Sequence, residues 1–316
     1  MRTSPTTTRN GGRGTSRRSR TRRGRPRDPK TPCRTARAGP RVREGVELIR
    51  GGLELAPRIE PLWTALFDHH LAVGAAGLAT IQRSETWPRR LAHYRGLFAA
   101  HPEAEFLLAV RDGRDVGYAM RYVEREAGGE HGDGTMLLET LSVLPEARGN
   151  GIGSGLMDAV DRAARRSGIT RSAVEVLGGN SRARDVYLER GYAPSTEHWL
   201  RSEPPGTGAP PGSGPRAPEA VRAGLRRAAE ERGMAWTVLE GPDDTWVTAS
   251  EMVDLGCAVP GSIEAADLER SVSDIIAAGF WTLFVEIPAA PAAPELRDAL
   301  RGLRFRMCTE RLERDD

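Results

Sequence analysis

The sequence predicts a protein of the α/β (α+β) class, with a mixed central sheet flanked by helices and a smaller α/β domain at its C-terminal end. Two observations carry this prediction. Short apolar runs typical of strands alternate with stretches of helical spacing between residues 46 and 303. Within residues 137–166, one such strand is followed by a glycine-rich loop that runs directly into an amphipathic helix.

Length and composition favour a two-domain protein without membrane segments. The chain has 316 residues, 39% of them hydrophobic, and no apolar run approaches the roughly 18 residues of a membrane span. Its three cysteines, Cys33, Cys257 and Cys308, are far apart and form no C-x-x-C pair. The histidines show no metal-ligand spacing. We therefore expect no disulfide framework and no metal site, and the reducing cytoplasm as the compartment.

The charge is distributed unevenly. Residues 1–43 hold fourteen arginines and Lys30 against Asp28, a net charge of +14, which leaves −11 for the rest of a chain whose total is +3. An acidic body suits an enzyme that attracts cationic amines, and it equally suits a protein that needs only solubility.

The first 43 residues are expected to be a disordered tail. They are rich in Arg, Gly, Pro, Ser and Thr and almost lack large apolar side chains, so ordering them would bury too little surface. A basic tail can also hold nucleic acid phosphates without sequence specificity, and this is the only route to nucleic acid that the sequence offers. A third interpretation of this segment is that translation starts downstream of it, near Val42 or Val46.

The fold is predicted to begin with a strand at residues 46–50. Apolar residues at helical spacing between residues 61 and 67 mark a helix with a proline near its first turn, and Trp87-Pro88 opens a second helix. A hairpin follows at residues 105–123, and the next strand is residues 137–143.

The glycine loop at residues 148–154 is predicted to be an anion site. It delivers its glycines to a helix N-terminus, where unpaired backbone amides and the positive end of the helix dipole meet. Gly151 and Gly153 let an anion approach the backbone closely, and Arg148 adds a charged donor. The P-loop pattern is excluded because no lysine follows Lys30, and the glycine interval is wrong for a dinucleotide fingerprint.

This region resembles the GNAT superfamily of N-acetyltransferases. The acetyl-CoA loop of that family, R/Q-x-x-G-x-G/A, stands here as Arg148-x-x-Gly151-x-Gly153. A second block is similar to the family's N-x-x-A-x-x-x-Y-x-x-x-G-F/Y. Its matching positions are Asn180, Ala183, Tyr187, Gly191 and Tyr192.

The resemblance implies a GNAT fold in which two parallel strands splay apart around acetyl-CoA, with no metal. It implies that Asn180 binds the pantetheine arm and that Tyr187 protonates the departing thiolate. The cofactor-binding positions carried over are Leu141, Val143, Arg148, Gly149, Asn150, Gly151, Ile152, Gly153, Ser154 and Asn180.

Glu139 is the candidate base. Period-2 alternation places it on the same sheet face as Leu141 and Val143, from which it would deprotonate the incoming ammonium through water. The alternative is that Glu139 is a charged residue at an ordinary position of the strand, without a catalytic role. Because no cysteine lies in the motif region, we expect direct attack by the amine rather than an acyl-enzyme.

The resemblance implies acetyl transfer from acetyl-CoA to a primary amine. Acidic surface and the short polar loop at residues 124–134 point to a small-molecule acceptor. The alternative from another class is a non-catalytic acyl-CoA-binding regulator, associated with nucleic acid through the tail. Thiol release with some amine separates the two.

The domains are predicted as a tail at 1–43, the acetyltransferase domain at 44–202, a Pro/Gly-rich linker at 203–218 and an α/β domain at 219–316. The last of these keeps the order of elements of the first domain, so it reads as a degenerate copy or as an unrelated α+β domain. It lacks a G-x-G loop at residues 259–263 and has Pro291 in place of Asn180. We therefore expect no cofactor there.

Overall fold

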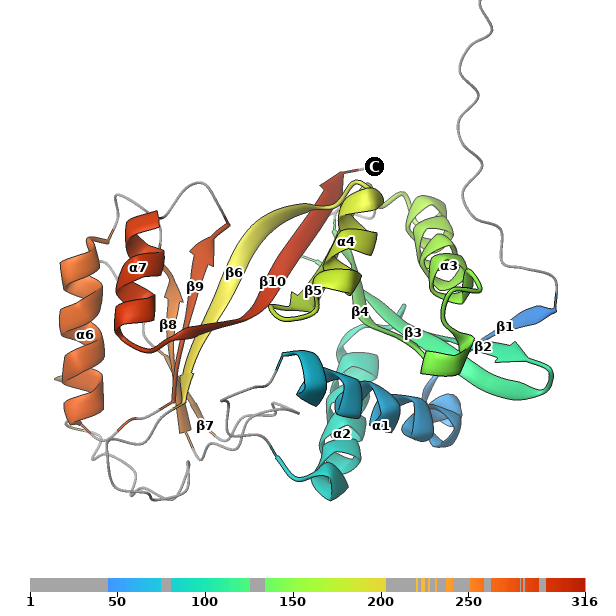
Figure 1. Ribbon diagram of the computed structural model, residues 1–316, viewed down its shortest axis with the longest axis horizontal. Helices are drawn as coiled ribbons and strands as arrows, with labels where there is room; N and C mark the ends of the chain where they lie inside the picture. The colour runs from blue at the N-terminus through green and yellow to red at the C-terminus, as the bar shows by residue number, and fades with distance from the viewer. Residues whose placement is uncertain are drawn as a thin grey trace, which may run out of the picture. The chain divides into compact units, whose positions relative to one another are not determined.

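The computed structural model describes residues 45–74, 81–125, 134–202, 237–240, 251–258, 263–278, 282–289 and 294–315, with single positions between residues 220 and 280. The elements labelled in Figure 1 are β1 (Val46–Gly51), α1 (Ala56–Val73), α2 (Arg83–Ala100), β2 (Glu105–Arg111), β3 (Arg114–Glu124), β4 (Thr135–Val143), α3 (Ile152–Arg166), β5 (Arg171–Leu177), α4 (Ser181–Glu189), β6 (Ala193–Ser202), β7 (Thr237–Glu240), β8 (Glu251–Cys257), α6 (Ala265–Ala277), β9 (Thr282–Pro288), α7 (Pro294–Gly302) and β10 (Arg306–Asp315).

The strands form one mixed sheet of ten strands in the order β1-β2-β3-β4-β5-β10-β6-β9-β8-β7. β1 to β4 are joined by antiparallel pairing, whereas β4 pairs with β5 in parallel, as β8 does with β9. A mixed sheet flanked by helices confirms the predicted fold class.

Helices cover both faces of the N-terminal part of the sheet. Leu107 and Ala109 of β2 pack in one core with residues of α3. Phe106 and Leu108, which alternate with them and so point the other way, pack in a second core with residues of α1 and α2. The β2–β3 hairpin closes through Asp112 and Gly113, whose φ angles of 51° and 74° suit a two-residue hairpin turn.

Both N-terminal helices begin earlier than the sequence indicated. Pro61 and Pro88 were expected near helix starts, but α1 begins at Ala56 and α2 at Arg83, so each proline lies inside its helix. A proline removes one backbone hydrogen bond. Tertiary packing offsets that loss, because α1 buries Leu62, Trp63, Leu66 and Phe67 after its proline.

The chain then runs twice through the same order of elements. The first run is β4, α3, β5, α4 and β6, and the second is β8, α6, β9, α7 and β10. In each run the first two strands pair in parallel across a helical connection. The second run packs around its own core, which includes Leu268, Val272, Leu283 and Val285.

The two runs exchange their last strands. β10 pairs with β5 of the first run, and β6 pairs with β9 of the second. β10 and β6 also pair with each other, antiparallel, at the centre of the sheet. The strand expected to complete the first domain is therefore present as β6, but β10 separates it from β5. The strand β10 was not predicted from the sequence.

The charges of β10 are matched by partners on neighbouring elements. Glu310 is 5% exposed and accepts a 2.6 Å hydrogen bond from Arg184 of α4. Arg314 donates a 2.9 Å hydrogen bond to Asp161 of α3. A charge buried with a hydrogen-bonded partner is tolerated where an isolated one is not. These pairs tie the exchanged strand to the helices of the first run.

Several predicted segments lie outside the described residues. They are the tail at 1–43, the linker at 203–218, most of the loop at 124–134 and the stretch at 259–262. The domain boundaries stay predictions. Within the part of the chain that is described, no helix is both long and apolar enough to cross a membrane. The same residues include no cluster of His, Cys, Asp and Glu arranged to hold a metal ion.

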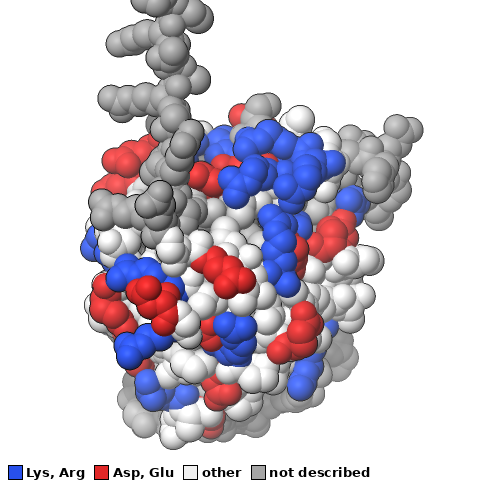
Figure 2. Space-filling view, turned by 90° about the vertical axis from the view of Figure 1, so that its right-hand side faces the viewer, with Lys and Arg blue, Asp and Glu red and all other residues white. Residues whose placement is uncertain are grey.

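The charged side chains are mixed on the face shown in Figure 2. Acidic and basic groups alternate over most of it, and basic groups gather along its upper edge. Interspersed charges of both signs cancel at a distance. The net negative charge of residues 44–316 thus does not appear as a uniform acidic surface on this face.

Candidate functional site

A cavity of about 570 Å³ opens between the ends of β4 and β5, beside α1, the loop before α3, and α4. Its lining includes all the residues predicted for the site except Asn150. Among the lining residues are His69, His70, Arg90, Glu139, Leu141, Val143, Arg148, Gly149, Gly151, Ile152, Gly153, Ser154, Glu175, Asn180, Arg182, Tyr187 and Thr309.

The cavity exists because the two parallel strands separate. Residues 135–138 of β4 pair with residues 171–174 of β5, and both strands continue beyond that pairing. The separation begins at a bulge. Opposite β3, Met120 pairs with Thr140 and Arg121 with Leu138, which leaves Glu139 as the extra residue. A bulge bends its strand and increases its twist, so β4 turns away from β5 at this point.

Beyond the bulge, Glu139, Leu141 and Val143 are partly exposed, whereas Thr140 and Ser142 are buried. This alternation is the one predicted from the sequence, and it places the first three on one face. All three line the cavity.

The glycine loop has the geometry of an anion site. Gly149 and Gly151 have φ angles of 76° and 75°, and Gly151 is the N-cap of α3. The amide of Gly155 donates to the carbonyl of Gly151 at 2.9 Å, so the amides just before it lie in the first turn, where a helix offers no acceptor. Arg148 is fixed by a 3.0 Å hydrogen bond from its Nε to the carbonyl of Val143.

Gly153 differs from the other two glycines. A Cβ added there would lie 3.7 Å from Val143 Cγ2, an ordinary contact, and its backbone is helical. The protein fold itself therefore requires glycine at 149 and 151, where φ is positive, but not at 153.

Asn180 and Tyr187 face the cavity from α4. Asn180 caps this helix, with its Oδ1 accepting from the amide of Ala183 at 3.3 Å, and it lines the cavity. Tyr187 is 6% exposed and packs edge-on against Tyr192, with ring centroids 5.9 Å apart. Burial, reinforced by Tyr192, raises the pKa of Tyr187 well above that of an exposed phenol. Tyr187 therefore keeps its proton at neutral pH.

Glu139 is held in an ion pair. Its carboxylate lies 2.5 Å from Arg90 Nη2 and 3.0 Å from His93 Nε2. Burial by itself raises the pKa of Glu139, but the charge of Arg90 and hydrogen bonds from His93 and Thr140 outweigh it and lower the pKa to about 2. Glu139 is thus a permanent anion and a weak base.

Residues 72–192 match the family model described as Acetyltransferase (GNAT) family. The chain contains a GNAT acetyltransferase domain. A mycothiol acetyltransferase of Nocardiopsis dassonvillei is 31% identical over 222 residues, which cover 68% of this chain and 64% of that protein. The chain thus spans less than two thirds of the length of this relative.

Two solved structures are similar to this chain. A GCN5-related N-acetyltransferase of Sphaerobacter thermophilus is 13% identical with a TM-score of 0.52, covering 87% of this chain and 97% of its own. That likeness includes both runs of elements. The PaiA N-acetyltransferase of Thermoplasma acidophilum, solved in complex with coenzyme A, is 17% identical with a TM-score of 0.37 and covers 47% of this chain and 90% of its own.

Glu175 lines the cavity of the GNAT domain from β5 and was not predicted from the sequence as a site residue. Although the side chain of Glu175 is 49% exposed, desolvation within the cavity raises its pKa, and the charges of Glu139 and Glu124 act in the same direction against that of Arg311. Its signal in the sequence was a lone carboxylate inside an apolar strand, Val174-Glu175-Val176. A carboxylate with a raised pKa in a cavity is a candidate base.

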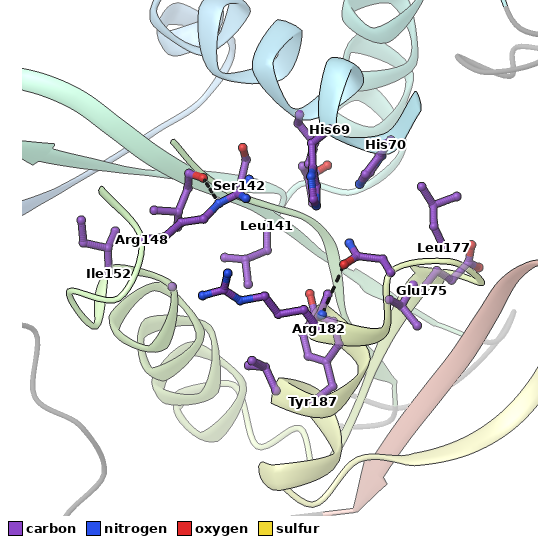
Figure 3. Close-up of a pocket in the computed structure, with 18 of the residues that line it drawn as sticks. His69, His70, Leu141, Ser142, Arg148, Ile152, Glu175, Leu177, Arg182 and Tyr187 are labelled. Atoms are coloured by element: carbon purple, nitrogen blue, oxygen red, sulfur yellow. Dashed lines mark hydrogen bonds between the residues drawn. The ribbon is translucent and has the colours of Figure 1, made fainter. Parts of the chain in front are cut away.

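Arg182 and the histidines of α1 were likewise not predicted from the sequence as site residues. Arg148 and Arg182 reach the cavity from different elements, the glycine loop and α4, and His69 and His70 reach it from α1 (Figure 3). Burial and then the charges of Arg148 and Arg182 lower the pKa of His69. Burial lowers the pKa of His70 to about 3, with smaller contributions from His69 and Arg90. The two arginines therefore converge on one end of the cavity of the GNAT domain.

The second run differs at the corresponding helix. α6 has Glu264 at its N-cap and Asp267 in its first turn. Carboxylates at this end of the helix neutralise the positive end of the helix dipole, and they repel a phosphate. The loop before this helix lies largely outside the described residues.

Proposed function

We propose that the protein is an acetyl-CoA-dependent N-acetyltransferase that acts on a primary amine by direct attack. The observation that carries the proposal is one cavity that joins three parts. They are a gap between splayed parallel strands, a glycine loop at the N-terminus of α3, and a protonated phenol at Tyr187.

The chain offers donors suited to acetyl-CoA, which would supply the thioester. Amides of residues 149–154, with Arg148 and Arg182, provide positive charge for the pyrophosphate. The unpaired edge of β4 at Leu141 and Val143 provides backbone groups for the pantetheine amides. Asn180 Nδ2 provides a further donor.

We assign the base to Glu175 and a fixed electrostatic role to Glu139. A base has to release and accept its proton near the working pH. Glu139, which the sequence suggested for this task, is a weak base because its pKa is about 2. The pKa of Glu175 is raised. Glu139 then serves to favour a cationic amine in the cavity, and Glu175 accepts the ammonium proton directly or through water.

In the transfer itself the amine nitrogen, having lost one proton to Glu175, bonds to the thioester carbonyl carbon. The carbon–sulfur bond then breaks and the nitrogen releases its second proton to solvent. Tyr187 donates its proton to the departing sulfur. A phenol that stays protonated across the physiological range is available for this step in every turnover. Bulk solvent restores the proton.

The acceptor we propose is a small-molecule amine. Two carboxylates, Glu139 and Glu175, line the same cavity as the proposed thioester site. The Nocardiopsis relative is named for mycothiol, so amines of that chemistry belong in the first panel of acceptors.

The test is calorimetric titration of acetyl-CoA into the full chain, followed by thiol release with a panel of amines. Gly151→Val should abolish binding, because it distorts the loop and fills the anion site. Gly168→Val is the matched control: Gly168 has a φ of 71° at the other end of α3, so the backbone strain is similar while the site is untouched. A folded wild-type chain that does not bind acetyl-CoA contradicts the proposal. Binding without thiol release for any amine favours the acyl-CoA-binding regulator.

A further inference from the structure

His198 of β6 lies beside Glu175 of β5, although β10 separates the two strands. Thr309 of β10 is paired in register with Leu177 of β5 and with His198. Residues directly opposite in a sheet share a face. On that face, His198 Nδ1 is 2.8 Å from Thr309 Oγ1 and 3.9 Å from Glu175 Oε2.

A second carboxylate approaches the imidazole from the other side. His198 Nε2 is 3.8 Å from Glu286 Oε2 of β9, and the ring lies 5.4 Å from that of Phe284. His198 is 9% exposed. The imidazole is therefore enclosed between two carboxylates and largely screened from water, where charges interact more strongly than at the surface.

Glu175, Thr309 and His198 form a row that begins at the wall of the candidate active site. Glu175 and Thr309 both line the cavity, and His198 stands behind them. The row exists only because the last strands are exchanged, since β10 comes from the second run and β6 from the first. The C-terminal part of the chain thus contributes directly to the surroundings of a cavity carboxylate.

Other charges also face Glu175. Arg311 is paired with it in register on β10, but its guanidinium donates to Glu313 at 2.8 Å and to Glu124 at 3.2 Å. Glu139 faces it from β4 and carries its own counter-ion, Arg90. The excess negative charge from these neighbours opposes ionisation of Glu175, and a protonated imidazole at His198 would offset it.

We propose that His198 is a positioning residue for Glu175, which keeps this carboxylate ionised and in place through its own protonated ring and through Thr309. The inference rests on the proposed function only in treating Glu175 as the base. The charge effect itself is a property of the folded protein.

The charges around Glu175 determine in which direction the loss of His198 would move its titration. Carboxylates on two sides of an imidazole favour its protonated form. A cation about 4 Å away favours the carboxylate form of Glu175. Removing it leaves the desolvation in the cavity and the nearby acidic groups, which favour the protonated acid, so Glu175 would lose its proton at a higher pH.

The experiment follows the side-chain carboxyl of Glu175 by ¹³C NMR against pH in the full chain, with its signal assigned from Glu175→Gln. His198→Asn, which keeps a donor near Nδ1 but no charge, should move the titration midpoint upward. In acetyl transfer, the same variant should lose about tenfold in kcat/KM on the acid side of the profile and keep the plateau and the affinity for acetyl-CoA. Thr309→Val removes the hydrogen bond alone and should cause a smaller displacement in the same direction.

His101→Asn is the control. His101 ends α2, stacks on Tyr122 at 4.5 Å and does not line the cavity, so this change should leave the Glu175 titration unaltered. An unaltered titration in His198→Asn and Thr309→Val overturns the inference. If no amine is acetylated, the proposed function fails, and the NMR titration still decides whether His198 controls Glu175.

Discussion

Arg90 and Glu139 form an ion pair inside the protein, with 2.5 Å between Arg90 Nη2 and the carboxylate. Their side chains are 9% and 13% exposed. The guanidinium of Arg90 also lies 4.3 Å above the ring of Trp63 and 4.6 Å from the ring of Tyr94. The pair joins α2 to the bulge of β4, so it supports the splayed strand and fixes a negative charge at the cavity.

Glu139→Gln should destabilise the protein at neutral pH, because it leaves the buried guanidinium without its counter-ion. The pKa of Glu139 falls from 4.5 to about 2 on folding, which corresponds to about 3 kcal/mol. Because the folded-state pKa is the lower one, this stability is fully present above about pH 4.5 and is lost as the pH falls towards 2. Urea unfolding of wild type and variant at several pH values measures it.

The exposed pair Arg83–Asp68 provides the comparison. Its side chains are 62% and 48% exposed, so Asp68→Asn should change the free energy of unfolding by less than about 1 kcal/mol. Equal effects of the two substitutions would mean that the Arg90–Glu139 pair is open to water in solution.

The pH dependence of acetyl transfer should distinguish the two carboxylates. Desolvation in the cavity and the nearby acidic groups raise the pKa of Glu175, so activity should rise with pH as Glu175 loses its proton, and Glu175→Gln should remove most of kcat. Glu139→Gln should keep the acid limb, because Glu139 is already ionised throughout that range. Profiles of kcat/KM for both variants test the assignment. A profile whose acid limb disappears only in Glu139→Gln would return the base role to Glu139.

Tyr187→Phe should lower kcat by roughly 10²- to 10⁴-fold, the usual contribution of a positioned proton donor. Because the ring is kept, acetyl-CoA should bind with unchanged affinity, as measured by calorimetry. Tyr192→Phe, which alters the neighbouring ring of the same pair, should retain activity. Full activity in Tyr187→Phe would show that the thiolate is protonated from water.

A chain ending at residue 202 should not fold as a stable monomer. This truncation removes β10, which pairs with β5 over residues 171–177, and it also removes β9, the other partner of β6. The exposed strand edges favour association. Gel filtration and circular dichroism of residues 44–202 beside the full chain test this. A cooperative, acetyl-CoA-binding monomer would show that the N-terminal domain is complete without the exchanged strand.

The sequence by itself determined the family and the local parts of the site. Gly149 and Gly151, the alternation of Glu139, Leu141 and Val143, and the capping residue Asn180 each act through neighbouring backbone. Such effects are fixed by spacing along the chain. Strand and helix periods were readable for the same reason, which is why the resemblance at residues 148–192 led to the family that comparison confirmed.

Only the tertiary structure decided how the two runs are joined and what surrounds the carboxylates. β10 escaped prediction because its sequence, Arg306 to Asp315, is mostly charged and polar, and its buried charges are acceptable only beside Arg184 and Asp161. The roles proposed for Glu139 and Glu175 depend on Arg90, 49 residues away from the first, and on the position of the second in the cavity. Ionisation is set by neighbours in space, and these neighbours are brought together by strand exchange and helix packing.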